Sequence, residues 1–394
     1  EEQFMENTRQ WLDNLTLKGS YGVQGNDNLG TYYAWQGLYD YTWPNATDAG
    51  AFVDKLENRK VTWEKNGNLN AGIEATMFGG RLGVSVEYYN RKTRDMLLNS
   101  PLPISTGFTG FNDNVGSLRN QGLEVSLRGT ILDKRDFRWD ATLMGSFNRN
   151  KVLSLTGGQD VITSGIRVIE VGRPIYTFYL PKTAGVDPAT GKQLYYAYWT
   201  QTVNDEGALV NTRCDEYITD NVAMATLSKY YHESREPKLF GSIGSTFTIL
   251  KNIDVSFLTT YSIGGWVYDG LYNGSMYVQY AGNNWHKNAK RRWQKPGDKT
   301  DVPMLEVGGS YATTSNSLID ASYFAIKNIT VGYTLPKRWL KKIDIESLRI
   351  YATLDNIAMF NHMDGMDPQY NFTGSVAYSY TPSRVIAFGI DLNF

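Results

Sequence analysis

The sequence predicts an all-β protein of long antiparallel strands, and three observations support this fold class. Stretches in which large apolar residues alternate with small or polar ones recur along the 394 residues, and alternation at period two is the mark of a strand with one apolar face. Glycine and tyrosine are abundant, with 38 and 27 residues, as turns and sheets require. The connections between the alternating stretches are alternately short and long.

Ten alternating stretches follow one another along the chain. Gly79 and Gly80 separate the second from the third, which predicts a tight hairpin, and Lys251 and Asn252 form a similarly short connection. In LPKRWLKKIDIE, Pro336 and the basic residues predict a turn or a single helical turn. The ten stretches have their apolar positions at residues 15–23, 69–77, 82–88, 123–127, 139–147, 243–249, 253–263, 329–335, 348–354 and 386–394.

The order of the connections favours a membrane barrel. It runs long, short, long, short and so on, beginning and ending with a long connection. Outer-membrane barrels place their short turns on the periplasmic side and their long loops outside. Residues 155–237 and 264–318 lack sustained alternation and are expected to be long irregular loops with short strand-like pieces. The sequence therefore predicts an antiparallel transmembrane β-barrel in the cell outer membrane.

Composition excludes several functional classes. With 39 basic and 40 acidic residues the formal charge is -1, so the chain has no basic excess for nucleic acid. One cysteine and three scattered histidines give neither a disulfide framework nor a zinc cluster. No G-x-S-x-G or H-E-x-x-H motif occurs, and we expect neither an enzyme nor a cofactor. The chain begins EEQFMENTRQ, without an initiator Met or an export signal, which suggests an amino-terminal truncation.

Several strings resemble one transporter family, and they occur in that family's order. Together they span nearly the whole chain, and the likeness is to the SusC/RagA-like TonB-dependent transporters of Bacteroidetes outer membranes. The strings are LTLKGSYGVQGN, RLGVSVEYYNRKTRDMLL, NVGSLRNQGLEVSL followed by FRWDATLMGSFNRNKV, VGRPIYTFY with AGVDPATGKQLYY, KRRWQKPGDKTDVPML, and ASYFAIKNITVGYTLPKRWL.

The resemblance implies a 22-stranded barrel closed by an amino-terminal plug, which imports glycan fragments or peptides too large for porins. It also implies energy coupling through TonB and a SusD-like surface lipoprotein as a lid. The plug and the other amino-terminal domains have no counterpart in this sequence. Residues 1–394 therefore resemble a carboxy-terminal part of the transporter barrel, with about ten strands of the 22.

Aromatic residues in the long connections are candidates for contact with a ligand or with the lid lipoprotein. Flat rings can stack on sugars, but tyrosine and tryptophan also form the girdles of such barrels at the lipid interface. That alternative, or simple packing, remains open for each residue. The candidates are Trp35, Tyr39, Trp43, Trp199, Tyr268 and Trp285.

The last strand carries a second candidate feature. Ile386, Phe388, Ile390, Leu392 and Phe394 share one apolar face, which is expected to meet lipid while the alternate residues face the lumen. We expect this strand to pair with residues 348–354 and to leave its other edge unpaired. By resemblance to outer-membrane proteins, Phe388, Ile390, Leu392 and Phe394 are a candidate assembly signal.

One acidic pair could supply oxygen ligands to calcium. Asp364 and Asp367 lie in HMDGMDPQYN, and hard cations prefer carboxylate oxygens. Asp-Gly and Asp-Pro sequences also favour turns, and we prefer that interpretation; no metal is otherwise expected.

Three functional hypotheses follow. The first is active import of large nutrients, with oligosaccharides preferred to peptides because the net charge is near zero and the loops are aromatic. The second is a small stand-alone barrel that acts as an adhesin or pore. The third is a soluble carbohydrate-binding β-sandwich, which rests on the aromatic loops alone.

Overall fold

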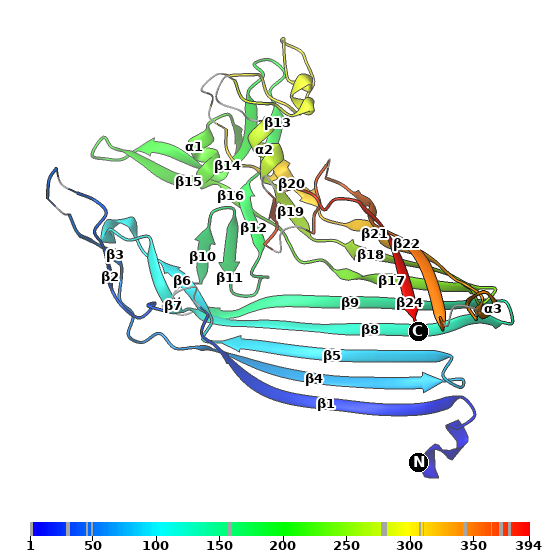
Figure 1. Cartoon of the computed structure of the whole chain (residues 1–394). Coiled ribbons are helices and arrows are strands. Elements are labelled where there is room, and N and C mark those ends of the chain that lie inside the picture. Colours follow the sequence, from blue (N-terminus) through cyan, green and yellow to red (C-terminus); the bar gives the residue numbers. More distant parts are fainter. Residues whose placement is uncertain are drawn as a thin grey trace.

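The largest element of the computed structural model is a ten-stranded antiparallel sheet in which each strand pairs with the next along the chain (Figure 1). The structure describes residues 3–28, 32–44, 46–48, 50–155, 160–276, 282–306, 309, 311–341, 345–363, 365–369, 373–376 and 380–394. The ten strands are β1 (Leu12–Asn26), β4 (Glu64–Met77), β5 (Leu82–Arg94), β8 (Gly116–Lys134), β9 (Phe137–Leu155), β17 (Leu239–Ile249), β18 (Ile253–Ile263), β21 (Tyr323–Thr334), β22 (Ser347–Asn361) and β24 (Val385–Asn393).

The ten predicted strands and the order of their connections are confirmed. Four short connections lie at one end of the sheet, which we call the turn end, and the five long connections lie at the other, the loop end. The basic segment after Pro336 forms the short helix α3 (Lys337–Leu340), as expected. At the turn end the backbone N–H of Glu346 donates to Asn393 O, which holds the end of β24 beside the last short connection.

Register sorts the side chains of the sheet onto two faces. In the last pair of strands, Leu392 lies opposite Leu348 and Ile390 opposite Ile350, while Asp391 lies opposite Arg349. Directly opposite residues share a face, so one face is apolar and the other polar. We call the apolar side the outward face and the polar side the inward wall. A single ten-stranded sheet with an exposed apolar face is not the two-layered sandwich of the third hypothesis.

The long connections are folded, which corrects the expectation of irregular loops over residues 155–237 and 264–318. Their strands are β2 (Leu38–Asp40), β3 (Phe52–Lys55), β6 (Leu97–Pro101), β7 (Gly110–Asn114), β10 (Val161–Ser164), β11 (Arg167–Glu170), β12 (Thr177–Pro181), β13 (Thr183–Val186), β14 (Gln193–Val203), β15 (Leu209–Thr219), β16 (Lys229–Ser234), β19 (Trp266–Asp269), β20 (Leu318–Asp320) and β23 (Ser375–Val376). Most of these strands are short, and β12 and β19 pair with segments far away in the sequence, so no sustained alternation marks them.

These strands form small sheets at the loop end. β10, β11, β12 and β16 make one sheet, β13 to β15 a second, and β20, β19 and β23 a third, while β2–β3 and β6–β7 are separate hairpins. The helices at this end are α1 (Val222–Leu227) and α2 (Gly270–Met276), with 3-10 turns at Ile104–Thr106, Lys287–Arg291 and Ser315–Ser317, while a further 3-10 turn at Gln3–Thr8 precedes β1. None of the described helices is long and apolar enough to cross a membrane.

The protein core lies in this second layer. We call the described parts of residues 160–238, 264–322 and 362–376 the loop assembly. Phe178 and Leu180 of β12 pack with Tyr268 of β19, and Arg167 Nη2 donates to Ser375 Oγ at 3.1 Å. The Tyr195 hydroxyl accepts from the backbone N–H of Ala312 at 3.3 Å. Three long connections thus fold as one body, whereas the sheet is a single layer with no interior of its own.

Candidate functional site

The inward wall is the most extensive polar surface of the sheet. The register of β4, β5, β8 and β9 places amides toward the loop end, carboxylates midway and arginines toward the turn end of the same wall. A polar wall opposite an apolar, exposed face is the arrangement of a barrel lumen. In that order the residues are Asn66, Asn68, Asn70, Asn120, Asn148 and Asn150; Glu74, Glu87 and Glu124; and Arg128 and Arg138.

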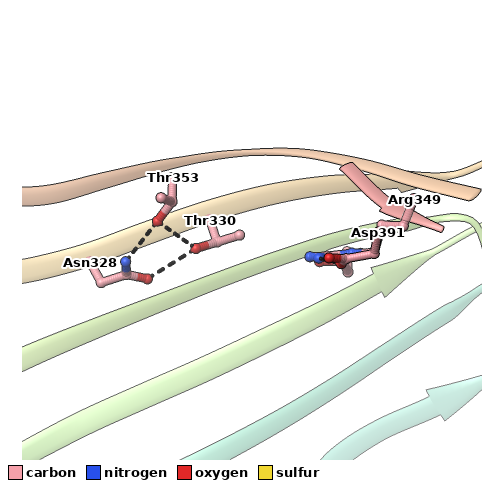
Figure 2. Close-up of polar contacts among 6 residues, drawn as sticks. Asn328, Thr330, Arg349, Thr353 and Asp391 are labelled. Atoms are coloured by element: carbon pink, nitrogen blue, oxygen red, sulfur yellow. Dashed lines mark hydrogen bonds and ion pairs between the residues drawn. The ribbon is translucent and has the colours of Figure 1, made fainter. Parts of the chain in front are cut away.

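Arg349 organises the turn end of the wall (Figure 2). Its Nε and Nη2 donate to the two carboxylate oxygens of Asp254 at 2.9 and 2.6 Å, and its Nη1 donates to Asp391 at 3.1 Å. A two-pronged contact of this kind fixes the guanidinium plane. β21 runs between β18 and β22, and Gly332 of β21 leaves the space for this contact, because an ideal Cβ there would lie 2.5 Å from Asp254 Oδ1.

A second polar network lies further along the same strands (Figure 2). Asn328 Nδ2 donates to Thr353 Oγ1 at 2.9 Å and to Asp355 at 2.7 Å. The hydroxyls of Thr330 and Thr353 lie 2.9 Å apart. Each of these groups is satisfied by a neighbour on the wall, so the network stiffens the wall rather than offering free donors.

At the loop end, Asn150 joins the wall to the loop assembly. This residue is 4% exposed; its Nδ2 donates to Asn120 Oδ1 at 2.7 Å, and its Oδ1 accepts from the backbone N–H of Ile175 at 2.8 Å. The backbone N–H of Asn150 donates to Glu236 at 3.1 Å. Burial raises the pKa of Glu236, and this hydrogen bond opposes the rise only in part.

Two hollows open on the inward wall. The one toward the turn end has a volume of 560 Å³ and is lined by Arg81, Arg128 and Arg138, above the small residues Gly83 and Gly244. The other has a volume of 520 Å³, and its lining includes Glu87, Glu124 and Phe240. A solute that crosses along this wall would therefore meet amides with Arg91 of β5 among them, then carboxylates, then further guanidinium groups.

The aromatic candidates of the first long connection are exposed. Trp35 lines a hollow of 430 Å³ together with Tyr32 and Trp63. Tyr39 lies on β2 and is 60% exposed. Trp43 meets Phe52 edge-on, with ring centroids 6.4 Å apart. The structure therefore gathers Trp35 with another tryptophan that the sequence did not single out, whereas Tyr39 and Trp43 are not among the described residues that line this hollow.

The other three aromatic candidates lie in the loop assembly. Tyr268 is only 8% exposed and belongs to the cluster with Phe178 and Leu180, so the structure gives it a packing role, and its contact with a ligand stays a prediction. Trp199 is half-buried on β14, where its carbonyl accepts from the Tyr217 hydroxyl at 2.9 Å. Trp285 is 37% exposed and lines a small enclosed hollow beside Met276 and Val302.

The structure describes only one member of the acidic pair that was considered for calcium. Asp364 lies outside the described residues. Asp367 is buried, and its Oδ1 accepts from the backbone N–H of Gln369 at 2.8 Å, which is the turn that the sequence favours. Within the described part of the chain, no three His, Cys, Asp or Glu side chains gather as a metal ion would require.

The terminal strand has the predicted geometry. β24 pairs with β22 from Ser347 opposite Asn393 to Asp355 opposite Val385, and it forms an edge of the sheet whose other edge is β1. Phe388 and Phe394 are 81% and 86% exposed, and Ile390 and Leu392 lie on the same outward face. This placement suits a strand that meets lipid; the role of these residues in assembly stays a prediction.

Sequence reasoning missed the cluster of Arg349, Asp254 and Asp391. Each lies at an inward position of its strand, so the alternation marks it as polar and lumen-facing. Only the pairing of β18, β21, β22 and β24 brings the three together. An ionisable residue at an inward position of an alternating strand was the available signal.

Comparison with known proteins identifies the family. The family described as "TonB dependent receptor-like, beta-barrel" matches residues 9–357. TonB-dependent receptor P26 of Formosa agariphila is 28% identical over 100% of this chain and 41% of its own length. TonB-dependent receptor SusC of Bacteroides thetaiotaomicron is 27% identical over 100% of this chain and 39% of its own length.

A solved structure of the RagAB peptide transporter has the same fold. It superposes with a TM-score of 0.83 at 28% identity and covers 100% of this chain and 42% of that chain. This chain thus spans about two fifths of the length of the relatives that it matches. The family is one of transporters and not of enzymes, in agreement with the sequence prediction. The chain belongs to the TonB-dependent receptor β-barrel family and is a SusC/RagA-like part of an outer-membrane barrel.

Proposed function

We propose that this chain is part of the wall of a TonB-dependent importer that carries oligosaccharides across the outer membrane. The observation that carries the proposal is the row of amides at the loop end of the inward wall, with Asn68 and Asn70 on β4, Asn120 on β8 and Asn148 on β9. An amide both donates and accepts hydrogen bonds, and so do the hydroxyls of a sugar. A neutral, hydroxyl-rich polymer is therefore well matched to the amides at the loop end of the wall.

The loop assembly is the proposed surface for a SusD-like lipoprotein lid. It is a folded body joined to the wall through Asn150 and Glu236, so a load on the lid can be passed to the wall. Coupling to TonB and closure by a plug are assigned to parts of the intact protein other than residues 1–394. This division follows from the family and from the share of its relatives that the chain spans.

Peptide import is the second candidate, and one observation favours it. The solved relative with a TM-score of 0.83 is a peptide transporter. Peptide backbones also donate and accept hydrogen bonds, so the amide row suits them as well. The carboxylates and guanidinium groups further along the wall would then meet the charged ends and side chains of the peptide.

Uptake by the intact transporter separates the two candidates. The variant Asn68→Ala/Asn70→Ala removes two amides from the wall, and we expect oligosaccharide uptake at low concentration to fall roughly fivefold to tenfold, about the effect of one or two lost hydrogen bonds. Asn90→Ala is the control, because Asn90 lies on the outward face of β5. A fall in peptide uptake with unchanged oligosaccharide uptake would overturn the first proposal in favour of the second.

A further inference from the structure

The outward face changes character toward the loop end. Along β5 its outward positions run from Tyr88 through Asn90 to Lys92 and Arg94, and they follow the apolar Leu82, Val84 and Val86. β8 and β9 show the same order, with Arg119 following Gln121, and Arg149 and Lys151 following Phe147. Toward the loop end, the outward face thus changes from apolar to amide and then to cationic residues. This order suits a surface that contacts first the acyl chains and then the headgroups of a membrane.

The cations form a continuous belt over four strands. Lys92 of β5 lies opposite Arg119 of β8, and Arg119 lies opposite Lys151 of β9. Arg149 lies one outward position before Lys151, and Lys65 of β4 lies opposite Arg94 of β5. We call these six residues the basic belt. Like charges directly opposite one another on neighbouring strands are destabilising, so the belt costs stability unless an anion offsets it.

Within the described part of the chain, few carboxylates offset the positive charges of the basic belt. Lys65 pairs with Asp95 at 3.0 Å. Among the described residues, no carboxylate lies within ion-pair distance of Lys92, Arg94, Arg119, Arg149 or Lys151. Nε of Arg119 is buried and has no hydrogen-bond partner in that part of the chain. The belt therefore calls for a ligand with several negative oxygens.

An aromatic hollow adjoins the belt at Lys65. This hollow is lined by Trp35, Trp63 and Lys65 and has a volume of 430 Å³. Trp63 lies on the outward face, because an ideal Cβ at Gly25 would lie 3.5 Å from its indole Cδ1 and Gly25 shares the outward face with Val23. The two indoles offer flat apolar faces at the height of the headgroups, where a sugar ring can pack.

We propose that the basic belt and the hollow bind the phosphorylated saccharide headgroup of an outer-leaflet glycolipid. Phosphate oxygens pair with guanidinium and ammonium groups, and the saccharide packs on Trp35 and Trp63. The belt lies directly above the apolar band of the outward face, which is the height of the headgroups around an outer-membrane barrel. Imported solute travels along the inward wall, so cargo is not the occupant. The proposal rests on the outer-membrane placement and not on the proposed substrate.

Lipid binding by the purified intact protein tests this assignment. The protein in an uncharged detergent is titrated with lipid A, with enzymatically dephosphorylated lipid A and with phosphatidylglycerol, and bound lipid is counted by native mass spectrometry. Arg119→Gln/Lys151→Gln should weaken lipid A binding at least roughly tenfold, because each cation at an anionic membrane surface contributes a several-fold gain in affinity. Binding of dephosphorylated lipid A should change little.

A variant with the same change of charge serves as the control. Arg91→Gln/Arg128→Gln removes two cations from the inward wall and should leave lipid A binding unchanged. Equal loss in both double variants, or no loss in Arg119→Gln/Lys151→Gln, would overturn the proposal. Trp35→Ala/Trp63→Ala should weaken lipid A binding more than phosphatidylglycerol binding, and equal effects on the two lipids would refute recognition of the saccharide. None of these measurements involves transport.

Discussion

Arg349 is the residue on which the turn end of the wall depends. Its guanidinium satisfies Asp254 through two hydrogen bonds and Asp391 through one, and so ties together strands that are separated by β21. Arg349 and Asp254 are 28% and 30% exposed, so water screens the contact only in part. Loss of the cation would leave two carboxylates close together without a partner.

Replacing Arg349 with Met should lower the free energy of unfolding of the intact protein by roughly 1–3 kcal/mol, between the values typical of exposed and of buried pairs. Urea unfolding in detergent micelles measures this quantity. Lys18→Met is the matched control, since Lys18 pairs on the same wall with Glu74 alone and both side chains are about half exposed. Equal losses of unfolding free energy in the two variants would mean that a guanidinium shared by two carboxylates stabilises the wall no more than a simple exposed ion pair.

Gly332 should matter because of the contact between Arg349 and Asp254. An ideal Cβ at Gly332 would lie 2.5 Å from Asp254 Oδ1 and 2.6 Å from Arg349 Nε, so Gly332→Ala should displace both groups and cost roughly 1 kcal/mol. In the Arg349→Met background the same change should cost less, because the guanidinium is gone and no longer holds the Asp254 carboxylate in place. A double-mutant cycle measures this coupling, and additive losses would show that the added methyl group conflicts with something else.

The terminal strand is the element whose outward face is best defined by the sequence. Phe388 of β24 and Phe394 just beyond it are highly exposed, and an aromatic end of this kind resembles the assembly signal of outer-membrane proteins. Deleting Phe394 from the intact protein should lower its outer-membrane level severalfold, while Phe394→Tyr, which keeps the ring, should not. Immunoblots of outer-membrane fractions measure this. Unchanged assembly after the deletion would show that the aromatic end is incidental.

The stability of the connection between β16 and β17 should depend on pH. Burial raises the pKa of Glu236, so the folded form holds the proton more tightly than the unfolded form. Its contribution to stability is fully present below the unfolded pKa and is lost as the pH rises through the raised pKa. Protection of the connection between β16 and β17 from added protease should therefore be greater near pH 5 than near pH 8, whereas half-buried His232 of the loop assembly, whose pKa burial lowers, acts in the opposite direction.

Glu236→Gln tests that cause directly. The amide imitates the protonated carboxyl, so the variant should be well protected at both pH values and should lose most of the pH dependence. Arg235 lies beside Glu236 in the sequence, and burial lowers its pKa, but arginine side chains are not deprotonated in proteins. A pH dependence that persists in the Gln variant would assign the effect to another group.

The sequence was sufficient for the elements that form locally. Each hairpin of the large sheet joins neighbouring stretches, so alternation and turn residues such as Gly79 and Gly80 reveal it. The loop assembly was not predictable in this way, because β12 pairs with β16 and β19 pairs with the two-residue β23 across long intervals. The burial of Tyr268 was not predictable for the same reason, because it depends on Phe178 and Leu180, which lie in another long connection.

At the scale of the whole molecule, a single-layered wall carries a folded body at one end. The large sheet has exposed apolar residues on its outward face, whereas the fully buried large side chains, such as Tyr195, Phe178 and Leu180, belong to the loop assembly. The wall therefore needs lipid on one side and the remainder of a barrel at its edges. The loop assembly has its own core and does not depend on lipid for its packing.

The two edges of the sheet give the last prediction. β1 and β24 are its outermost strands and do not pair with each other, whereas a stand-alone barrel of ten strands would have to join them. In the intact protein, cysteines at Ile350 and Ile390, which lie opposite each other, should be joined in high yield by a short thiol crosslinker. Cysteines at Leu17 and Ile390 should not be joined, because further strands separate β1 from β24 in the larger barrel. Both pairs are built in a background that carries Cys214→Ser and has no other cysteine, and yields are read after proteolysis. An efficient crosslink between positions 17 and 390 would mean that these ten strands close on themselves, and would revive the adhesin or pore hypothesis.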